Sequence, residues 1–410
     1  MKRLRLIGSL AAAVVATPAC GPGADAGEAL PPLPQPTELA SPASAASGEP
    51  DLAAAPGGRV LLTWFEQRGE RSVLLLSSLD PSGDGSAESW SSPRTVSDRQ
   101  HMVNWADFPT VLALDDGRVA VHYAARNTDG TRGASVHVSW SDDGGGSWSE
   151  PVVPHRPASE VPGGPGFVSL LPWSDGSLGV VWLTEFEQTA LRFTTVGANG
   201  AAPETVLDER ICDCCQTSAA TTSEGAVVVF RDRSAEEVRD ISIVRLVDGA
   251  WTDPAPVHQD GWTISSCPVN GPMVDADGRE VAVAWFTAAG DVPAVNVAFS
   301  GDAGASFAGA VRLDDGSPVG RVAVQLLAPG EAAVSWLERV GDRAEVRVRR
   351  VRADGTKSAS TTVAAADAGR ASGFPRMVRS GDTLVFAWTD TGGEDARVRV
   401  ATARLAEAGS

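Results

Sequence analysis

The chain has 410 residues, including 43 glycines and 27 prolines, and a formal net charge of −18 at pH 7. This acidity argues against a partner that is nucleic acid or an anionic membrane surface, and most simply reflects a soluble, self-repelling surface. Abundant glycine and proline, with no long amphipathic helical pattern after the N-terminus, predict many short strands joined by tight turns.

The N-terminal segment has the pattern of an export signal. Met1–Arg5 is basic, Leu6–Ala16 is apolar, and Cys20 follows a small residue. The apolar run is too short for a retained membrane span, so we expect a signal peptide at residues 1–19. The segment resembles a bacterial lipobox, which implies lipidation of Cys20 and a membrane-anchored lipoprotein of the bacterial cell envelope, on its periplasmic or outer side. Residues 20–48, rich in Ala, Pro, Gly and Ser, are expected to form a flexible tether.

The remainder of the chain, residues 49–410, repeats one unit. In each unit a short apolar segment and a turn precede a strand that ends in an aromatic residue, and this aromatic recurs every 48 to 59 residues. The seven aromatic residues are Trp64, Tyr123, Trp182, Phe230, Trp285, Trp336 and Trp388. A period near 50 residues indicates a propeller or a solenoid instead of independent domains.

Each unit continues with a third strand, a polar or glycine-rich turn and an outer strand such as Glu150–Val153. Four antiparallel strands per unit make a β-propeller blade, so the predicted fold is a single all-β propeller domain, expected as a monomer. We count seven blades, with six as the alternative. The last unit ends after its third strand, and we expect Pro36–Ser41 to supply its outer strand and close the ring.

Two turns share the pattern Ser-x-Asp-x-Gly-x-Ser-aromatic. The aspartate can accept backbone N–H bonds, the glycine allows a positive φ, and the aromatic side chain can pack the turn onto the sheet. The residues of the two copies are Ser141, Asp143, Gly145 and Trp148, then Ser300, Asp302, Gly304 and Phe307. Both copies resemble the Asp-box of the sialidase (BNR repeat) family, which implies third-to-fourth-strand turns of propeller blades.

The resemblance does not extend to the catalytic residues of that family. Its enzymes have six blades, an Arg-Ile-Pro motif before the first box, three arginines, an aspartate acid and a tyrosine nucleophile late in the chain. This sequence has no Arg-Ile-Pro, and its single tyrosine, Tyr123, lies in the second unit. An enzymatic role, if there is one, would be that of a sialidase-like glycoside hydrolase. The catalytic candidates are Asp107, Arg126, Arg231, Asp232, Arg239 and Asp240.

The cysteines form the sharpest local signal. Besides Cys20, the chain has Cys212, Cys214, Cys215 and, in the next unit, Cys267. In an extended strand Cys212 and Cys214 would point to one side and Cys215 to the other. Two interpretations stay open.

The first interpretation is disulfides, with a bridge between blades from Cys267, as is common in an oxidising compartment. The second is a soft-metal site of up to four thiolates for Cu(I) or Zn, with His258 and Met273 as further donors by position.

An arginine-rich run follows the second strand of the fourth unit. Arg231, Arg233 and Arg239, with Asn104 and Trp105 from an earlier loop, are the predicted ligand-binding residues. The arginines can form a fork for a carboxylate or sulfate. Alternatively the loop pairs its own charges, Arg231 with Asp240 or Arg239 with Asp232, and Trp105 serves in packing.

By connectivity, the cysteines and the arginine run open on one face of the propeller and the Asp-boxes on the other. Three hypotheses for function follow. The favoured one is a non-catalytic, surface-anchored propeller whose cysteine and arginine face binds a glycan, a protein or an anionic ligand. The others are a divergent glycoside hydrolase and a periplasmic thiol or copper-binding protein.

Overall fold

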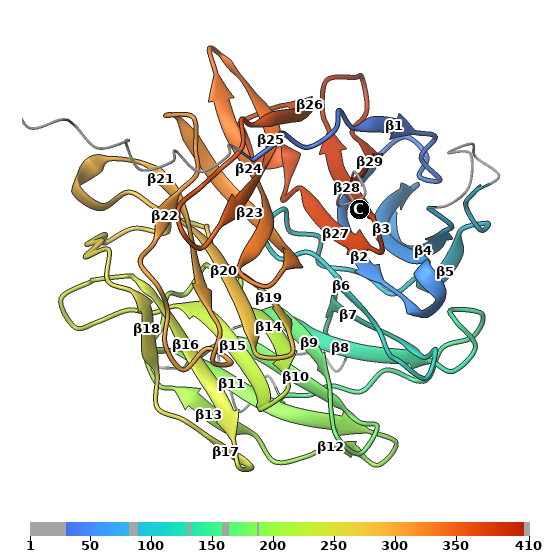
Figure 1. The fold of residues 1–410 in the computed structure, drawn as a ribbon. Helices are drawn as coiled ribbons and strands as arrows, with labels where there is room; N and C mark the ends of the chain where they lie inside the picture. The colour runs from blue at the N-terminus through green and yellow to red at the C-terminus, as the bar shows by residue number, and fades with distance from the viewer. Residues whose placement is uncertain (1–29, 82–88, 129–132, 158–163, 187, 406–410) are drawn as a thin grey trace, which may run out of the picture.

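Seven antiparallel β-sheets follow one another along the chain and surround a central axis (Figure 1). This computed structural model describes residues 30–81, 89–128, 133–157, 164–186 and 188–405. The predicted all-β propeller is confirmed, and its blades number seven. The predicted signal peptide and Cys20 lie outside the described residues.

The first strand of every blade lies innermost, and the chain runs outward from it. Blade 1 contains β2 (Ser47–Ala54), β3 (Val60–Arg68), β4 (Arg71–Leu79) and β5 (Arg94–Ser97), and blade 2 contains β6 (Thr110–Ala113), β7 (Val119–Arg126) and β8 (Ala134–Ser141). Blade 3 contains β9 (Pro165–Pro172), β10 (Leu178–Phe186), β11 (Gln188–Gly197), β12 (Gly200–Ala201) and β13 (Thr205–Asp208). Blade 4 contains β14 (Ser218–Thr222), β15 (Gly225–Arg231), β16 (Ile241–Val247), β17 (Ala250–Trp251) and β18 (Ala255–His258). Blade 5 contains β19 (Met273–Asp277), β20 (Glu280–Thr287), β21 (Ala294–Ser300) and β22 (Val311–Arg312). Blade 6 contains β23 (Pro318–Ala328), β24 (Glu331–Val340), β25 (Arg343–Arg352) and β26 (Thr361–Ala366). Blade 7 contains β27 (Arg376–Ser380), β28 (Thr383–Asp390), β29 (Arg397–Arg404) and β1 (Thr37–Leu39).

Most blades have four strands, with three exceptions in the middle of the chain. Blade 2 has three, because the predicted outer strand Glu150–Val153 is reduced to a single bridge between Val138 and Val152. Blades 3 and 4 each have five. Within the described ranges the helical segments are short 3₁₀ turns, and none has the length and apolar character needed to cross a membrane.

The seven repeated aromatic residues are buried and fill the spaces between blades. Trp64, for example, packs with Val385 and Val400 of blade 7, and Trp285 packs with Val227 and Ile243 of blade 4. A single blade would expose both of its apolar faces, and stacking between two neighbours buries them. The periodic aromatic therefore reports contact between blades.

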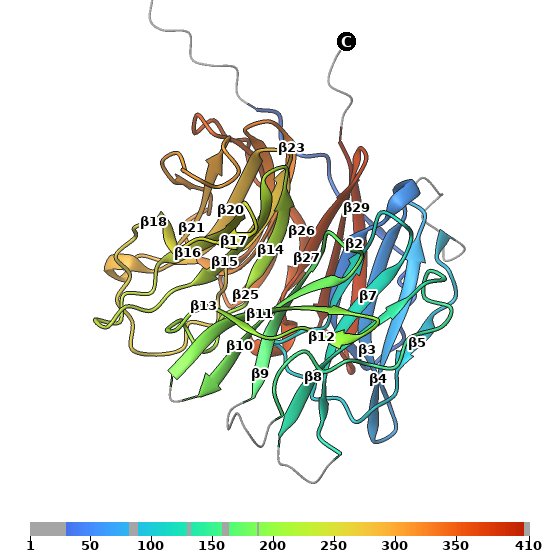
Figure 2. The same ribbon diagram turned by 90° about the horizontal axis from the view of Figure 1, so that it is seen from below.

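The ring closes between the two ends of the chain, as predicted. Strand β1 pairs antiparallel with β29 and becomes the outer strand of blade 7. Figure 2 shows this last blade, in red, beside the blue first blade. Leu30 and Leu33 are also buried, and the Thr361 hydroxyl donates to the Leu33 carbonyl at 3.0 Å. The prediction of a tether through residue 48 is therefore wrong for residues 30–48, which pack on the propeller.

Both Asp-box turns have the predicted local chemistry. Asp143 Oδ1 accepts the N–H groups of Gly146 and Ser147, both at 2.8 Å, and the Ser141 hydroxyl at 2.7 Å. The second box repeats the serine and aspartate contacts around Asp302. These bonds hold the pKa of both carboxyls below the usual range.

The glycine of each box is needed where the turn meets the preceding blade. Gly145 has φ +92°, and a Cβ there would lie 2.3 Å from Leu76 of blade 1. Gly304, with φ +79°, would place a Cβ 2.9 Å from Ile243 of blade 4. The boxes therefore anchor one blade against the next, as well as sealing their own turns.

Polar side chains link the inner strands around the axis. In most cases a side-chain oxygen accepts a backbone N–H of the following blade. These pairs are Asp51 with Val111, Asp107 with Phe167, Ser218 with Val274, Asn270 with Arg321, and Gln325 with Arg379, at 2.7 to 3.1 Å. Arg376 of blade 7 returns to Asp51 of blade 1 at 2.7 Å. The inner rim is thus polar because the blades need donors and acceptors to hold one another.

Candidate functional site

A cavity of about 290 Å³ lies on the axis, among the inner strands. Strands β2, β6, β9, β14 and β19 line it, together with Arg376 at the start of β27. Its polar side chains are Asp51, Asp107, Thr110, Ser169, Gln216, Thr217, Ser218, Asp275 and Arg376. A concave site with a few converging polar groups is the usual form of a small-ligand site.

Asp107 lines this cavity, unlike the five other predicted catalytic residues. Its Oδ1 accepts the Phe167 N–H at 2.7 Å, and its Oδ2 has no hydrogen-bond partner within the described ranges. A Cβ at Gly166 would lie 2.6 Å from Oδ2, so the glycine leaves room for the carboxylate. Burial raises the pKa of Asp107 to about 6.

Two further carboxylates of the cavity were not predicted from the sequence. Burial raises the pKa of Asp275 to about 6 and also raises that of Asp51. Asp51 pairs with Arg376, whose guanidinium lies 4.6 Å from the Phe108 ring centroid. In the sequence, both aspartates stand in segments whose pattern is that of an inner strand. That pattern does not show which side chains face the axis, and only the register of the blades in the structure does.

Replacing Asp107 by asparagine should stabilise the protein at neutral pH. Because the folded-state pKa of about 6 lies above the ordinary 3.8, the carboxyl stabilises the fold below pH 3.8 and loses that contribution as pH rises through 6. Asparagine keeps an oxygen for the Phe167 N–H and carries no charge. We expect the free energy of unfolding to rise by up to about 3 kcal/mol at pH 7.5 and to be unchanged at pH 4. Urea unfolding at both pH values tests this, and an equal loss at both would contradict it.

A turn at residues 104–107 reaches across one end of the cavity to distant blades. Gln216 of blade 4 donates to the Ala106 carbonyl at 2.6 Å. The Trp105 ring stacks on Phe374 of blade 7 at 5.9 Å, with the Arg321 guanidinium of blade 6 5.0 Å from its centroid. Asn104 is exposed, and Trp105 is half-buried. These two predicted ligand-binding residues therefore lie beside the cavity, although Trp105 also serves in packing.

The predicted arginine fork is not formed, because Arg231 is a structural residue. Its side chain is 1% exposed and donates to the carbonyls of Asn270, Arg239 and Phe286 at 2.6 to 3.0 Å. The guanidinium also lies 4.8 Å from the Trp262 ring centroid. Arg231 thus joins blade 4 to blade 5 and cannot reach a ligand in solution.

The other arginines of the run are also engaged. Glu237 accepts from Arg233 at 2.9 Å and from Arg239 at 2.8 Å, and the Arg239 side chain is 3% exposed. The predicted pairs Arg231–Asp240 and Arg239–Asp232 are therefore wrong, although the loop does pair its own charges, through Glu237.

The remaining catalytic candidates lie apart from the cavity. Asp232 accepts the Arg233 N–H and the Ser242 hydroxyl, and Asp240 accepts the N–H groups of Gly261 and Trp262. Arg126 is exposed beside a separate small pocket with His137 and Asn127. Tyr123 is buried and stacks on His137 at 5.5 Å.

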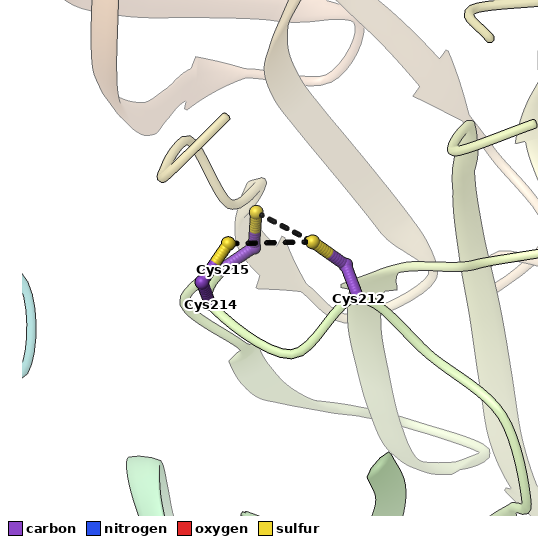
Figure 3. Close-up of side chains that lie close together, drawn as sticks. All are labelled: Cys212, Cys214 and Cys215. Carbon is purple, nitrogen blue, oxygen red and sulfur yellow. Dashed lines mark hydrogen bonds between the residues drawn. The ribbon is translucent and has the colours of Figure 1, made fainter. Parts of the chain in front are cut away.

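Three cysteines converge in the segment before β14 (Figure 3). The Cys212 sulfur lies 3.1 Å from that of Cys215 and 3.8 Å from that of Cys214. Residues 213 and 214 form a turn, so the prediction that Cys215 points away from the others is wrong. Cys212, Cys214, Cys215 and Cys267 are free in this structure, so the prediction of disulfides among them has no support here.

The neighbours of the three thiols determine which one ionises first. Sulfhydryl donors of Cys214 and Cys215 lower the pKa of Cys212, and Arg239 Nη1 lies 3.4 Å from its sulfur. Burial raises the pKa of Cys215. Cys267 is exposed, with its sulfur 3.7 Å from Asp213 Oδ1.

The two further donors proposed by position are absent from this group. Met273 lies in the axial cavity with its sulfur 3.9 Å from Arg376, and His258 contacts Asp260 and Trp285. The prediction of His258 and Met273 as extra donors is therefore wrong.

No protein-family model and no curated protein sequence matches this chain. Among solved structures, an ulvan lyase of polysaccharide lyase family PL25, bound to a GlcA(1-4)Rha3S unit, has a TM-score of 0.57 and 11% identity, covering 90% of this chain and 94% of the lyase. A protein of unknown function from Dyadobacter fermentans has a TM-score of 0.50 and 14% identity, covering 92% and 99%. A Hadza microbial sialidase has a TM-score of 0.43 and 14% identity, covering 71% and 63%. The chain therefore shares its propeller fold with the ulvan lyase and the Dyadobacter protein.

Proposed function

We propose that this propeller is an exported, envelope-anchored protein that binds the end of a neutral glycan in its axial cavity. The observation that carries the proposal is the cavity itself, which combines carboxylates, hydroxyls and the aromatic residues Phe108 and Phe167. Sugar rings offer hydroxyl donors to carboxylates and apolar faces to aromatic rings. The fold shared with a lyase that binds a glycan is consistent with this proposal.

Charge favours a neutral sugar over an anionic ligand. Above pH 6 both Asp107 and Asp275 are ionised. The positive charge of Arg376 is already matched by Asp51. The arginines of the blade 4 loop are engaged within the protein, so they do not supply the carboxylate grip of the earlier hypothesis.

Binding is tested with the intact mature protein on a glycan array, followed by calorimetry with the best ligand. Asp107→Asn and Asp275→Asn should each weaken affinity by about 10- to 100-fold, because each removes a charged hydrogen-bond acceptor. Asp232→Asn is the matched control, since this carboxylate lies outside the cavity and should leave affinity unchanged. Binding that none of the cavity variants alters would place the ligand elsewhere and overturn the proposal.

A glycoside hydrolase is the second candidate, on one specific observation. Asp107 and Asp275 line the same cavity, and burial raises the pKa of both to about 6, a range suited to a general acid near neutral pH. Turnover of a panel of chromogenic glycosides, including a sialic acid conjugate, would support the enzyme if Asp107→Asn abolishes it. Binding without turnover would support the non-catalytic role.

A further inference from the structure

The structure assigns a second site, separate from the axial cavity: we propose that Cys212, Cys214 and Cys215 bind one Cu(I) ion through three thiolates. Each of the three sulfurs lies within 4.8 Å of the other two, and they come from one short turn between blades 3 and 4. Figure 3 shows the three side chains pointing toward one another. This proposal depends on the positions of the three sulfur atoms, so it does not rest on the proposed binding of a glycan in the axial cavity.

The spacing of the sulfurs fits a metal ion. With metal–sulfur bonds near 2.3 Å, three sulfurs around one ion in a plane lie about 4 Å apart. The observed separations of Cys212 from Cys215 and Cys214 are 3.1 and 3.8 Å, so the group needs only a small expansion. Soft thiolate ligands select Cu(I) and Zn over harder ions.

The number of donors distinguishes between these two ions. Structural Zn sites are almost always four-coordinate. Cys267 is the nearest further thiol, but its sulfur groups with Asp213 and Cys214 and not with the other two cysteines. Three converging sulfurs without a fourth at the same point suit an ion that accepts three thiolates, and we therefore assign Cu(I).

The protein around the turn is suited to the charge of such a centre. Three thiolates and one Cu(I) carry a net charge of −2, which would be costly to bury without a cation nearby. Arg239 supplies one at 3.4 Å from the Cys212 sulfur, and its own side chain is 3% exposed. Each thiol gives up its proton as it binds the ion, so affinity should increase with pH.

Burial differs among the cysteines in a way that allows an ion to enter. Cys212 and Cys215 are buried, whereas Cys214 is half-buried. The exposed Cys267 lies beside Cys214, with the two sulfurs within 4.8 Å of each other. It serves as the matched control, because it is a neighbouring thiol outside the group of three.

The experiment is a titration of the intact, fully reduced protein with Cu(I) under anaerobic conditions against a chromogenic Cu(I) chelator. Ag(I), which air does not oxidise, is a second probe. We expect one ion per chain, and X-ray absorption of the wild type should show three sulfur neighbours. Cys212→Ser and Cys214→Ser should each weaken binding by more than about 100-fold, since even groups that only support a ligand change affinity by 10- to 100-fold. Cys267→Ser should bind like the wild type.

Four results would overturn the assignment. One is a protein that retains no Cu(I) against the chelator. Another is an equal loss in Cys267→Ser and Cys214→Ser, which would mean a different ligand set. The third is Zn(II) bound by four sulfurs in preference to Cu(I). The last is a Cys212–Cys215 disulfide, seen by mass spectrometry in protein isolated from the cell envelope. Wild-type absorption data keep the test decisive even if a serine variant fails to fold.

Discussion

Replacing Arg231 by methionine should lower the free energy of unfolding by about 3–5 kcal/mol. The side chain is buried and donates to three backbone carbonyls. Arg239 lies in the same blade 4 loop, Asn270 in the loop before β19, and Phe286 in β20 of blade 5. Methionine fills a similar volume and donates nothing, so these carbonyls stay buried without a partner. Urea unfolding at pH 7 measures the loss.

Arg233→Met is the matched control, two positions along the same loop. Arg233 is partly exposed and pairs with Glu237 four residues away, a contact worth at most about 1 kcal/mol. Equal effects of the two substitutions would contradict the structural role of Arg231. A loss of ligand binding in an Arg231 variant would therefore report on folding and not on a direct contact.

Removing residues 30–41, together with the segment before them, should destabilise the propeller by about 5 kcal/mol or more. The deletion removes β1, the outer strand of blade 7, and the buried side chains of Leu30 and Leu33. It also exposes the edge of β29, and an unpaired edge strand favours association between molecules. Chemical unfolding of the truncated protein measures the loss of stability, and light scattering measures the association.

The control is a chain that begins at Leu30, which retains every contact described for β1 and the two leucines. This chain should unfold like the full mature protein. Adding a synthetic peptide of residues 30–41 to the shorter chain should restore part of the stability, because the strand pairs without a covalent link. If both truncations unfold alike, closure of the ring by β1 is not a main source of stability.

Much of the architecture could be predicted because its causes are local or periodic. An aromatic residue at the end of each second strand recurs because every blade must bury the same face, so Trp64 through Trp388 report the number of blades. The Asp-box turns close on hydrogen bonds within a few residues, such as those of Asp143 to Gly146 and Ser147. The need for an outer strand in blade 7 follows from counting strands.

The site was predicted less well, because its residues meet through contacts between blades. Asp107 was selected from the sequence, but Asp51, Asp275 and Arg376 were not, since nothing local distinguishes an inner-strand aspartate that faces the axis. The arginine run suggested an open fork. The guanidinium groups of Arg231 and Arg239 instead turn inward, because carbonyls of blade 5 accept from Arg231 and Glu237 of the same loop pairs with Arg239.

The cysteines show the same division between sequence and tertiary structure. The sequence by itself determined that four thiols lie at equivalent places of two adjacent blades, since the repeat aligns Cys212–Cys215 with Cys267. Only the tertiary structure decided that three of them converge and that Cys267 stays exposed. The reason is that the segment turns at residues 213 and 214 instead of extending. Arg239 contacts the Cys212 sulfur before this turn, and Gln216 after it bonds to Ala106 and Gly271 of other blades. Strand period and turn chemistry act over a few residues, whereas the direction of a side chain in a loop depends on what the neighbouring blades place against it.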